Sequence, residues 1–318
     1  MMLRLAVRFH YVPVLLLLAI WSGWFIHQGS FEINGERYYS LFDDGMISMT
    51  YAKNLTQGHG LNWAKFGDPV EGFSSPLWTF LMVPFQLLPI GWGKVSLAFA
   101  MFCAGILGLN VVVLDRILRK RLGITAILPR FAATLTLAFL YPLNYWSLVG
   151  MECGPQVLVF LLGIDLFLAF EREKLTKHLY KLGMVLAAAM LLRMDMVFFV
   201  GMVILVLAPW LWKNQRQGLK FLLIAGLPMV AYMLFRMAYF HDIFPNTYYL
   251  KLHKISLDLR IERAWFHFKA WAKPLWLIWL LLPVMMVPLI RNKAMWLSLA
   301  LIAIYLGYNL YAGGDAWE

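Results

Sequence analysis

The sequence predicts an all-α polytopic membrane protein, a single transmembrane domain over residues 1–318 with about nine spanning helices. Hydrophobic residues make up 62% of the chain and charged residues only 14%, which is too little polar surface for a soluble domain. Apolar runs long enough to span a bilayer recur along the chain. The basic residues behind the net charge of +11 lie in short clusters between those runs, so the charge indicates membrane topology and no nucleic-acid partner.

The first predicted span covers residues 11–27, an apolar run that follows Arg4 and Arg8. It resembles a signal peptide, but the run ends in Trp21 and Phe25, and no small-residue cleavage site follows. We therefore interpret it as an uncleaved first helix. The other predicted spans lie near 92–114, 126–148, 154–170, 178–193, 195–212, 219–240, 274–290 and 294–312.

Two stretches decide how often the chain crosses the bilayer. Arg193 and Asp195 separate the short runs 178–193 and 195–212, so one long tilted helix is the alternative to two spans. The apolar stretch 76–90 has about 15 residues and is interrupted by prolines, which is too short for a full crossing. It predicts a helix that lies in the outer interface or re-enters it.

The positive-inside rule sets the predicted orientation. With the N-terminus in the cytoplasm, most of the 17 acidic residues fall on the outer, periplasmic side of a bacterial cytoplasmic (inner) membrane. Two periplasmic loops are long, the first over 28–91, with interfacial helices, and the second over 241–273. Every loop that is assigned to the cytoplasm is then basic, namely those that contain residues 116–121, 172–181, 213–220 and 291–293.

The second long loop contains a predicted amphipathic helix over residues 255–272. Leu257, Ile261 and Trp265 recur there at helical spacing. An apolar side with aromatic anchors opposite a basic side is typical of a helix that lies in the membrane interface. The basic side consists of Arg260, Arg263 and Lys269.

Five polar clusters interrupt the apolar chain, and the predicted topology places all five on the outer side. A single charge at a membrane border is often an ordinary solvated loop residue. Five on one side favour a shared site, because charges at membrane borders are costly and tend to be functional. The clusters are Asp43-Asp44 with Glu71, then Glu152, Arg193 with Asp195, Asp242 with Asn246, and Asp315 with Glu318.

The adjacent carboxylates of Asp43 and Asp44 suit two roles. One can act as a general base while the other orients a substrate hydroxyl or a cation, and the repulsion between them raises one pKa. Alternatively, either carboxylate caps the predicted helix over residues 45–55 and interacts favourably with its dipole. The two readings are compatible, because a cap also holds a carboxylate in place.

Short motifs follow one another along the whole chain. They are DDGMIS (43–48), GHGL (58–61), VEGF (70–73), LWT (77–79), SLVGME (147–152), LR (192–193) with Asp195, DIFPNTYY (242–249) and YAGGD (311–315). In their order and sidedness these motifs resemble those of polyprenyl-phosphate-sugar glycosyltransferases of the GT-C superfamily, and most closely the branch that contains the cell-wall terminal arabinofuranosyltransferases. Met194 and Asp195 depart from that branch, which has proline and glutamate there.

The resemblance implies a GT-C-like helix bundle that transfers a sugar, with arabinofuranose favoured, from a polyprenyl phosphate to a hydroxyl with inversion. It implies that Asp43 is the general base and that Asp44 positions the acceptor or shares the proton. The departing phosphate needs a cation, for which Arg193, Lys251, Lys254, Arg260 and Arg263 are candidates, although snorkelling at the interface explains each equally well. The substrate-binding candidates are His59, Glu71, Glu152, Arg193, Asp195, Asn246, Tyr248 and Asp315.

Several alternatives stay open at this point. A divalent metal is one, because several carboxylates converge although no ligand spacing demands a cation. The acceptor is a cell-envelope glycan or a surface protein such as a pilin. A membrane transporter or flippase is the main rival function, and an assembly protein is another. Because the chain stops just after the last motif, we expect a fragment or a shortened relative of the family.

Overall fold

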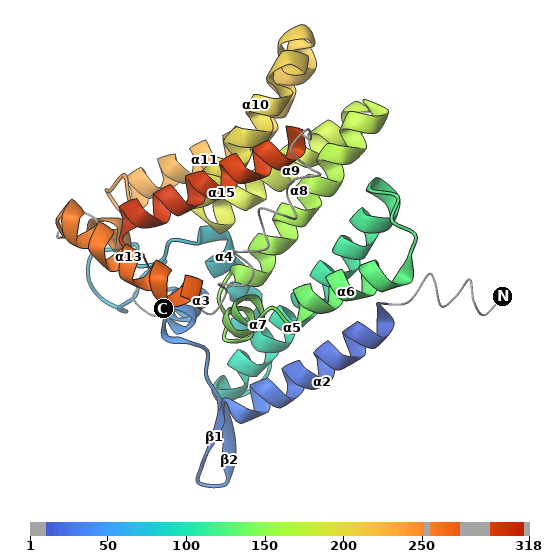
Figure 1. The fold of residues 1–318 in the computed structure, drawn as a ribbon. Coiled ribbons are helices and arrows are strands. Elements are labelled where there is room, and N and C mark those ends of the chain that lie inside the picture. The colour runs from blue at the N-terminus through green and yellow to red at the C-terminus, as the bar shows by residue number, and fades with distance from the viewer. Residues whose placement is uncertain (1–10, 251–254, 274–292, 315–318) are drawn as a thin grey trace. The chain divides into compact units, whose positions relative to one another are not determined.

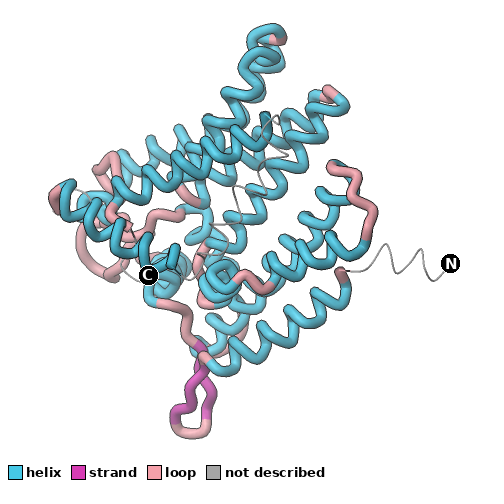
Figure 2. Tube along the Cα trace, in the orientation of Figure 1, coloured by secondary structure: helices cyan, strands magenta, loops and turns pink. Residues whose placement is uncertain are grey.

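The computed structural model describes residues 11–250, 255–273 and 293–314. These residues are mainly helical, with one two-stranded antiparallel sheet among them (Figures 1 and 2). The chain forms two compact units, the first of Met1–Met194 and Leu211–Ile243 and the second of Asp195–Trp210 and Phe244–Glu318. Among the described residues, the helices long and apolar enough to cross a membrane are Trp92–Arg121, Cys153–Glu173, Met194–Lys213 and Gln215–Tyr239.

The first unit is built around a bundle in which successive helices pack in the order α5, α8, α9 and α11. Around the bundle lie a shorter apolar helix near the N-terminus and the helices of the loop predicted over 28–91, together with α6 and α7. The elements are α2 (Val12–Gln28), α3 (Asp43–Thr56), α4 (Pro76–Gln86), α5 (Trp92–Arg116) with its π-helical extension η1 (Ile117–Arg121), α6 (Ile127–Ala138), α7 (Tyr141–Leu148), α8 (Cys153–Glu173), α9 (Thr176–Leu192) and α11 (Gln215–Tyr239).

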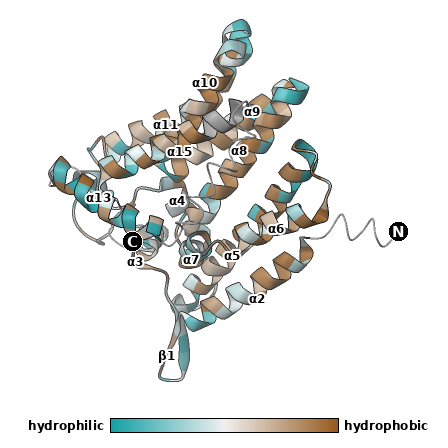
Figure 3. Ribbon diagram, in the orientation of Figure 1, coloured by the Kyte–Doolittle hydropathy of each residue, from teal (hydrophilic) through white to brown (hydrophobic). Residues whose placement is uncertain are grey.

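Helices α5 and α8 run in the same direction. The Asn110 side-chain amide donates to the Gly154 carbonyl at 3.0 Å near the start of α8, and Arg121 lies 3.8 Å from the Glu173 carboxylate at its end. At 1.5 Å per residue, the 21-residue α8 is about 30 Å long. That distance matches the hydrocarbon thickness of a bilayer. Figure 3 shows hydrophobic residues along these helices and hydrophilic residues where α8 meets α9.

Helices α9 and α11 also run in the same direction. Near their starts, a Cβ at Gly183 would lie 3.1 Å from Ile224. At their other ends, an Arg236 nitrogen lies 3.8 Å from the Met194 sulfur. The charge pattern predicts that α5 and α8 cross the bilayer in one direction and that α9 and α11 cross in the opposite one. The parallel pairs α5 with α8 and α9 with α11 agree with this order of crossings.

The predicted span 126–148 consists of two helices, α6 and α7, instead of one. In a continuous helix the Ala138 carbonyl would accept the backbone N–H of residue 142. Pro142 has no N–H, and its ring would clash with the preceding turn. The Asn144 side-chain amide donates to the Ala138 carbonyl instead, at 2.9 Å. The break therefore has a cause in the sequence that apolar run length alone does not reveal.

The stretch 178–212 is not one continuous helix. Helix α9 ends at Leu192, and Arg193 is extended, with φ −153° and ψ 133°. A short 3₁₀ turn, η2 (Met194–Met196), then leads into α10 (Val197–Lys213). Of the two alternatives that the sequence left open, the structure therefore has separate helices on either side of Arg193.

The long segment between α2 and α5 begins with a β-hairpin that the sequence analysis did not predict. Strand β1 (Ser30–Ile33) pairs with β2 (Glu36–Tyr39), and Ile33 lies opposite Glu36. Asn34 and Gly35 form the turn with φ values of 51° and 79°. A type I′ turn needs two positive φ values, and Asn-Gly is the dipeptide that best supplies them. The Asn34-Gly35 dipeptide was therefore the signal in the sequence from which the hairpin could have been predicted.

Part of the following segment, between β2 and α4, packs on the end of α11. Tyr51, Leu61 and Phe73 from the loop form one buried cluster with Tyr232 and Phe240. Helix α3 begins two residues before the predicted 45–55 helix. Helix α4 has 11 residues, too few to cross a bilayer, so its location in the membrane interface stays a prediction.

The second unit contains most of α10 together with α12 (Asn246–Tyr248), α13 (Leu257–Ala272) and α15 (Lys293–Ala312). Helix α13 matches the amphipathic helix predicted over 255–272. It packs on α15, where the Arg260 guanidinium donates to the Tyr311 carbonyl at 2.9 Å. The predicted span 274–290 lies outside the described residues.

Candidate functional site

The Asp43-Asp44 pair forms the first turn of α3, and both residues are exposed. The Phe42 N–H donates to the Val149 carbonyl at 2.9 Å and so fixes where the helix starts. One carboxylate oxygen of Asp43 accepts the Asp44 N–H at 2.8 Å. The positive end of the helix dipole favours negative charge here. The helix therefore holds the two carboxylates at its start and leaves them accessible.

Three of the sequence motifs meet beside this pair. A Cβ at Gly45 would lie 3.3 Å from the Val149 carbonyl oxygen. At Gly150 the φ is +93°, and a Cβ would lie 2.8 Å from a Leu41 methyl group. The Trp78 indole N–H donates to the Gly150 carbonyl at 2.9 Å. We call this contact of Gly45, Gly150 and Trp78 the glycine junction, because only glycines allow the backbones to approach so closely.

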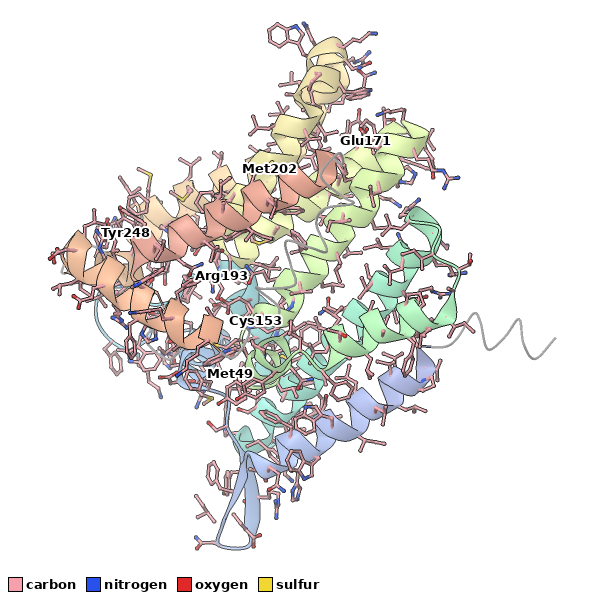
Figure 4. The ribbon with its side chains drawn as sticks, in the orientation of Figure 1. Met49, Cys153, Glu171, Arg193, Met202 and Tyr248 are labelled. Carbon is pink, nitrogen blue, oxygen red and sulfur yellow. The ribbon has the colours of Figure 1, made fainter. Side chains whose placement is uncertain are left out.

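Glu152 and Arg193 form an ion pair that joins the start of α8 to the end of α9. Their nearest atoms, Arg193 Nη1 and Glu152 Oε1, are 2.8 Å apart. Glu152 is buried, with 4% of its surface exposed, whereas the Arg193 side chain is 36% exposed. Figure 4 labels Arg193 close to the start of α8, where Cys153 is marked. The pair thus holds the Arg193 guanidinium at Nη1, and the side chain as a whole is partly exposed.

Glu71 lies in a second, fully buried ion pair. Its carboxylate is 2.5 Å from Arg236 Nε and accepts the Tyr232 hydroxyl at 2.5 Å. Arg236 Nη2 adds a hydrogen bond of 3.1 Å. Glu71 is 3% exposed and Arg236 is not exposed at all. These contacts tie the VEGF motif to α11, so the structure gives Glu71 a packing role, and its predicted contact with substrate stays a prediction.

The sequence analysis did not single out Arg236. Its guanidinium also donates to the Ile243 carbonyl at 3.2 Å and lies 3.8 Å from the sulfur of Met194, the residue after Arg193. Arg236 therefore connects the first loop, the α9 end and the chain after α11. Arg236 is the one Lys or Arg in the apolar run 221–240. That charge was the signal available in the sequence, because a charge within such a run needs a partner inside the protein.

His59 lies half-buried in the turn that follows α3. Its backbone N–H donates to the Asn54 carbonyl at 2.9 Å. The next residue, Gly60, has φ +78°, and a Cβ there would lie 2.5 Å from the Tyr239 hydroxyl. That hydroxyl accepts the Leu61 N–H at 2.9 Å. The backbone of the GHGL motif is thus fixed to Tyr239 of α11. These contacts orient the turn that carries the His59 imidazole.

Tyr51 holds the VEGF motif from the side of α3. Its hydroxyl donates to the Val70 carbonyl at 2.6 Å and accepts the Gly72 N–H at 2.9 Å. Burial raises the pKa of Tyr51 above its ordinary value of 10.0, and the Glu71 carboxylate raises it further. The phenol is therefore protonated at neutral pH and serves as a structural bridge.

The remaining predicted site residues belong to the second unit. Asn246 is exposed at the start of α12, and the Tyr248 ring stacks on Phe244 with centroids 4.3 Å apart. Asp195 is half-buried in η2. Of the phosphate-binding candidates, Arg263 is exposed, whereas Arg260 is 9% exposed and lies 4.8 Å from the centre of the Tyr311 ring. Lys251, Lys254, Asp315 and Glu318 lie outside the described residues.

The opposite end of the first unit holds its own buried acids. Asp165 pairs with Arg116 and with Arg121, whose Nε lies 2.8 Å away. Asp115 accepts two hydrogen bonds from the Arg130 guanidinium, at 2.8 and 2.5 Å. Both carboxylates are buried. At this end the acids are held in ion pairs with arginines, whereas the exposed pair Asp43-Asp44 lies at the other.

A metal site is not evident in the described part of the chain, where no group of three or more His, Cys, Asp or Glu residues is arranged to hold a metal ion. The described arrangement therefore offers two exposed carboxylates at a helix start, a partly exposed arginine held by a buried glutamate, and a rigid glycine junction beside the carboxylates.

Comparison with protein-family models, with curated proteins and with solved structures gives no match for the chain.

Proposed function

We propose that this protein is a membrane glycosyltransferase that moves a sugar, with arabinofuranose favoured, from a polyprenyl phosphate to a hydroxyl of a cell-envelope glycan or surface protein. One observation carries the proposal. The motif that bears Asp43 and Asp44 packs, through the glycine junction, on the motif that bears Glu152, and Glu152 in turn pairs with Arg193. Motifs separated by more than a hundred residues thus meet within one unit.

In the proposed reaction Asp43 accepts the proton of the acceptor hydroxyl. The hydroxyl oxygen forms a bond to the anomeric carbon as the bond from that carbon to the phosphate oxygen breaks. The electron pair leaves with the phosphate, and attack from the opposite face inverts the anomeric centre. Asp43 is exposed and its position is fixed by α3, which is what a general base for an incoming substrate requires.

Arg193 is the proposed partner of the departing phosphate. Planar guanidinium groups bind phosphate oxygens in a bidentate fashion. The buried Glu152 fixes one edge of the Arg193 guanidinium, and the 36% exposure of the side chain leaves part of it accessible. Glu152 then acts as a positioning residue, because its effect on the phosphate passes through Arg193.

The test supplies membranes that contain the protein with labelled polyprenyl-phosphate arabinose and follows transfer to envelope material. We expect Asp43→Asn to lower the transfer rate by at least about a hundredfold, the usual contribution of a general base. Asp44→Asn should have a smaller effect. Asp68→Asn is the matched control, because Asp68 is also an exposed aspartate of the first outer loop, and it should transfer at the wild-type rate.

The outcomes separate the base from the sugar and from the rival function. Full activity in both Asp43→Asn and Asp44→Asn would rule out the proposed base. Failure with every lipid-linked pentose, together with turnover of another lipid-linked sugar, would overturn arabinose alone. Movement of a lipid-linked sugar across the bilayer without transfer to any acceptor would favour the transporter or flippase.

A further inference from the structure

A pocket of about 230 Å³ lies where the break between α6 and α7 faces α2. Five aromatic rings and one amide line it. Two of the rings, Phe139 and Tyr141, are 38% and 69% exposed, so the pocket is accessible from outside. The lining residues are Trp21 and Phe25 of α2, Phe139 of the break, and Tyr141, Asn144 and Tyr145 of α7.

The oxygen and the nitrogen of the amide in this pocket each have a hydrogen-bond partner within the protein. The Asn144 side-chain oxygen accepts the Trp21 indole N–H at 2.7 Å, and its NH₂ group donates to the Ala138 carbonyl at 2.9 Å. The first bond holds α2 against α7, and the second holds α7 against the end of α6. Because the amide bonds inward and the other lining groups are rings, the lining suits a hydrocarbon ligand better than a polar one.

Helix α7 connects this pocket to the candidate site. Its first turn lines the pocket, and the turn after its last residue accepts the Phe42 N–H through Val149. The helix has 8 residues, a length of about 12 Å. A second route passes through ring contacts, with centroids 5.1 Å apart for Tyr145 and Trp146 and 5.2 Å apart for Trp146 and Phe42. The start of α3 at Asp43 is therefore connected to the pocket by one short helix, α7.

We propose that this pocket seats the isoprenoid chain of the polyprenyl-phosphate donor, which deepens the proposed function and rests on it. An amphiphile whose head reacts at Asp43 must place its chain in apolar surroundings nearby, and α7 spans about 12 Å between the pocket and the turn that holds Phe42. The pocket between α2 and α7 offers such surroundings, within a helix pair expected to border the lipid. Flat aromatic faces pack well against a chain that carries methyl branches.

The test is photo-crosslinking of the full-length protein in membranes with a polyprenyl phosphate that carries a photoreactive group on its chain. Peptides that contain residues 21–25 and 139–145 should carry the label, and excess unmodified polyprenyl phosphate should remove it. Tyr141→Ala and Phe25→Ala should each weaken the labelling about tenfold, the effect of losing one aromatic contact. Tyr141 is largely exposed, so its variant tests the pocket without disturbing the packing of α2 on α7.

Ile20→Ala is the control, since Ile20 is 71% exposed on α2 and does not line the pocket; its labelling should match the wild type. A photoreactive phosphatidylcholine that labels the same peptides equally and is not displaced by polyprenyl phosphate would overturn the proposal in favour of a bulk-lipid site. Labelling requires no sugar transfer, so the two proposals fail separately. Transfer with the label elsewhere contradicts the pocket alone, whereas a labelled pocket without transfer contradicts the glycosyltransferase alone.

Discussion

At the scale of single residues, buried charge is the main feature of the first unit. Glu71 with Arg236 and Asp115 with Arg130 are pairs in which both side chains are at most 2% exposed. A buried ion has a desolvation cost of several kcal/mol, which its partner offsets only when both are present. In the Glu71 pair, the carboxylate comes from a loop and the arginine from an apolar helix. The pair therefore makes the fold of that loop depend on α11.

Removing one partner of this pair should destabilise the protein more than removing both. We expect Glu71→Gln or Arg236→Met alone to lower the free energy of unfolding by about 3–5 kcal/mol, because each leaves an unpaired buried group. The double variant should recover part of that loss. Equilibrium unfolding in detergent, followed by circular dichroism, measures the three values and their coupling.

The matched control is the exposed ion pair of the hairpin. Glu32 and Arg37 are 3.7 Å apart, with side chains 58% and 41% exposed. Glu32→Gln should therefore change the free energy of unfolding by less than about 1 kcal/mol. A loss in the double variant equal to the sum of the losses in the Glu71 and Arg236 single variants would show that the pair contributes no coupling.

At the scale of elements, short helices and tight junctions position the candidate site. Helix α3 starts at Asp43 because Phe42 is bonded to the turn after α7, and that turn is possible because Gly150 has φ +93°. The turn is in contact with Trp78 of α4 and precedes α8 at Cys153. Four elements of the first unit therefore meet at one glycine. A substitution at Gly150 should therefore displace the carboxylates of Asp43 and Asp44 without contacting either residue.

Gly150→Ala should abolish most transfer activity, since the new Cβ would lie 2.8 Å from Leu41 and the positive φ is unfavourable for alanine. Gly123→Ala is the control. Gly123 also has positive φ, +69°, but nothing lies within 4 Å of its Cβ position, so only the backbone cost of about 1–2 kcal/mol applies. Initial rates and unfolding of both variants distinguish the contact from the conformational cost. Equal activity in the two would contradict a positioning role for the junction.

At the scale of the whole molecule, the first unit has two chemically different ends. One carries the basic turns at 116–121 and 172–181 and the arginine pairs of Asp115 and Asp165. The other, about 30 Å away along α8, carries the exposed Asp43-Asp44 pair and the Glu152–Arg193 pair. The positive-inside rule predicts that the basic end faces the cytoplasm. The acidic groups at the other end are a separate observation, because the rule concerns only lysine and arginine.

Topology reporters test that orientation. Fusions truncated after Lys120 and after Lys174 should both report the cytoplasm, and a fusion after Gly35 should report the outer side. Protease accessibility in intact cells provides an independent check on each fusion. An outer location for the Lys120 fusion would mean that the stretch 76–90 crosses the bilayer, despite the 11-residue length of α4.

Much of the fold follows from local sequence. The long apolar runs became α5, α8, α10 and α11 within a few residues of the predicted bounds, because a continuous apolar run can satisfy its backbone in lipid only as a helix. The amphipathic stretch 255–272 became α13 for a similarly local reason. Two local signals, Asn34-Gly35 and Pro142, were present but were not read as a hairpin and a helix break.

The sequence alone determined the class of the protein, the positions of its main helices and the clustering of polar motifs. Only the tertiary structure decided which polar groups meet. Arg236 with Glu71 and Arg193 with Glu152 are separated by 165 and 41 residues, and no spacing rule links them. Local propensity depends on neighbours within a few residues, whereas the cost of a buried charge selects its partner from anywhere that packing brings close. For that reason the candidate residues could be named from the sequence, while their division into buried pairs and accessible groups could not.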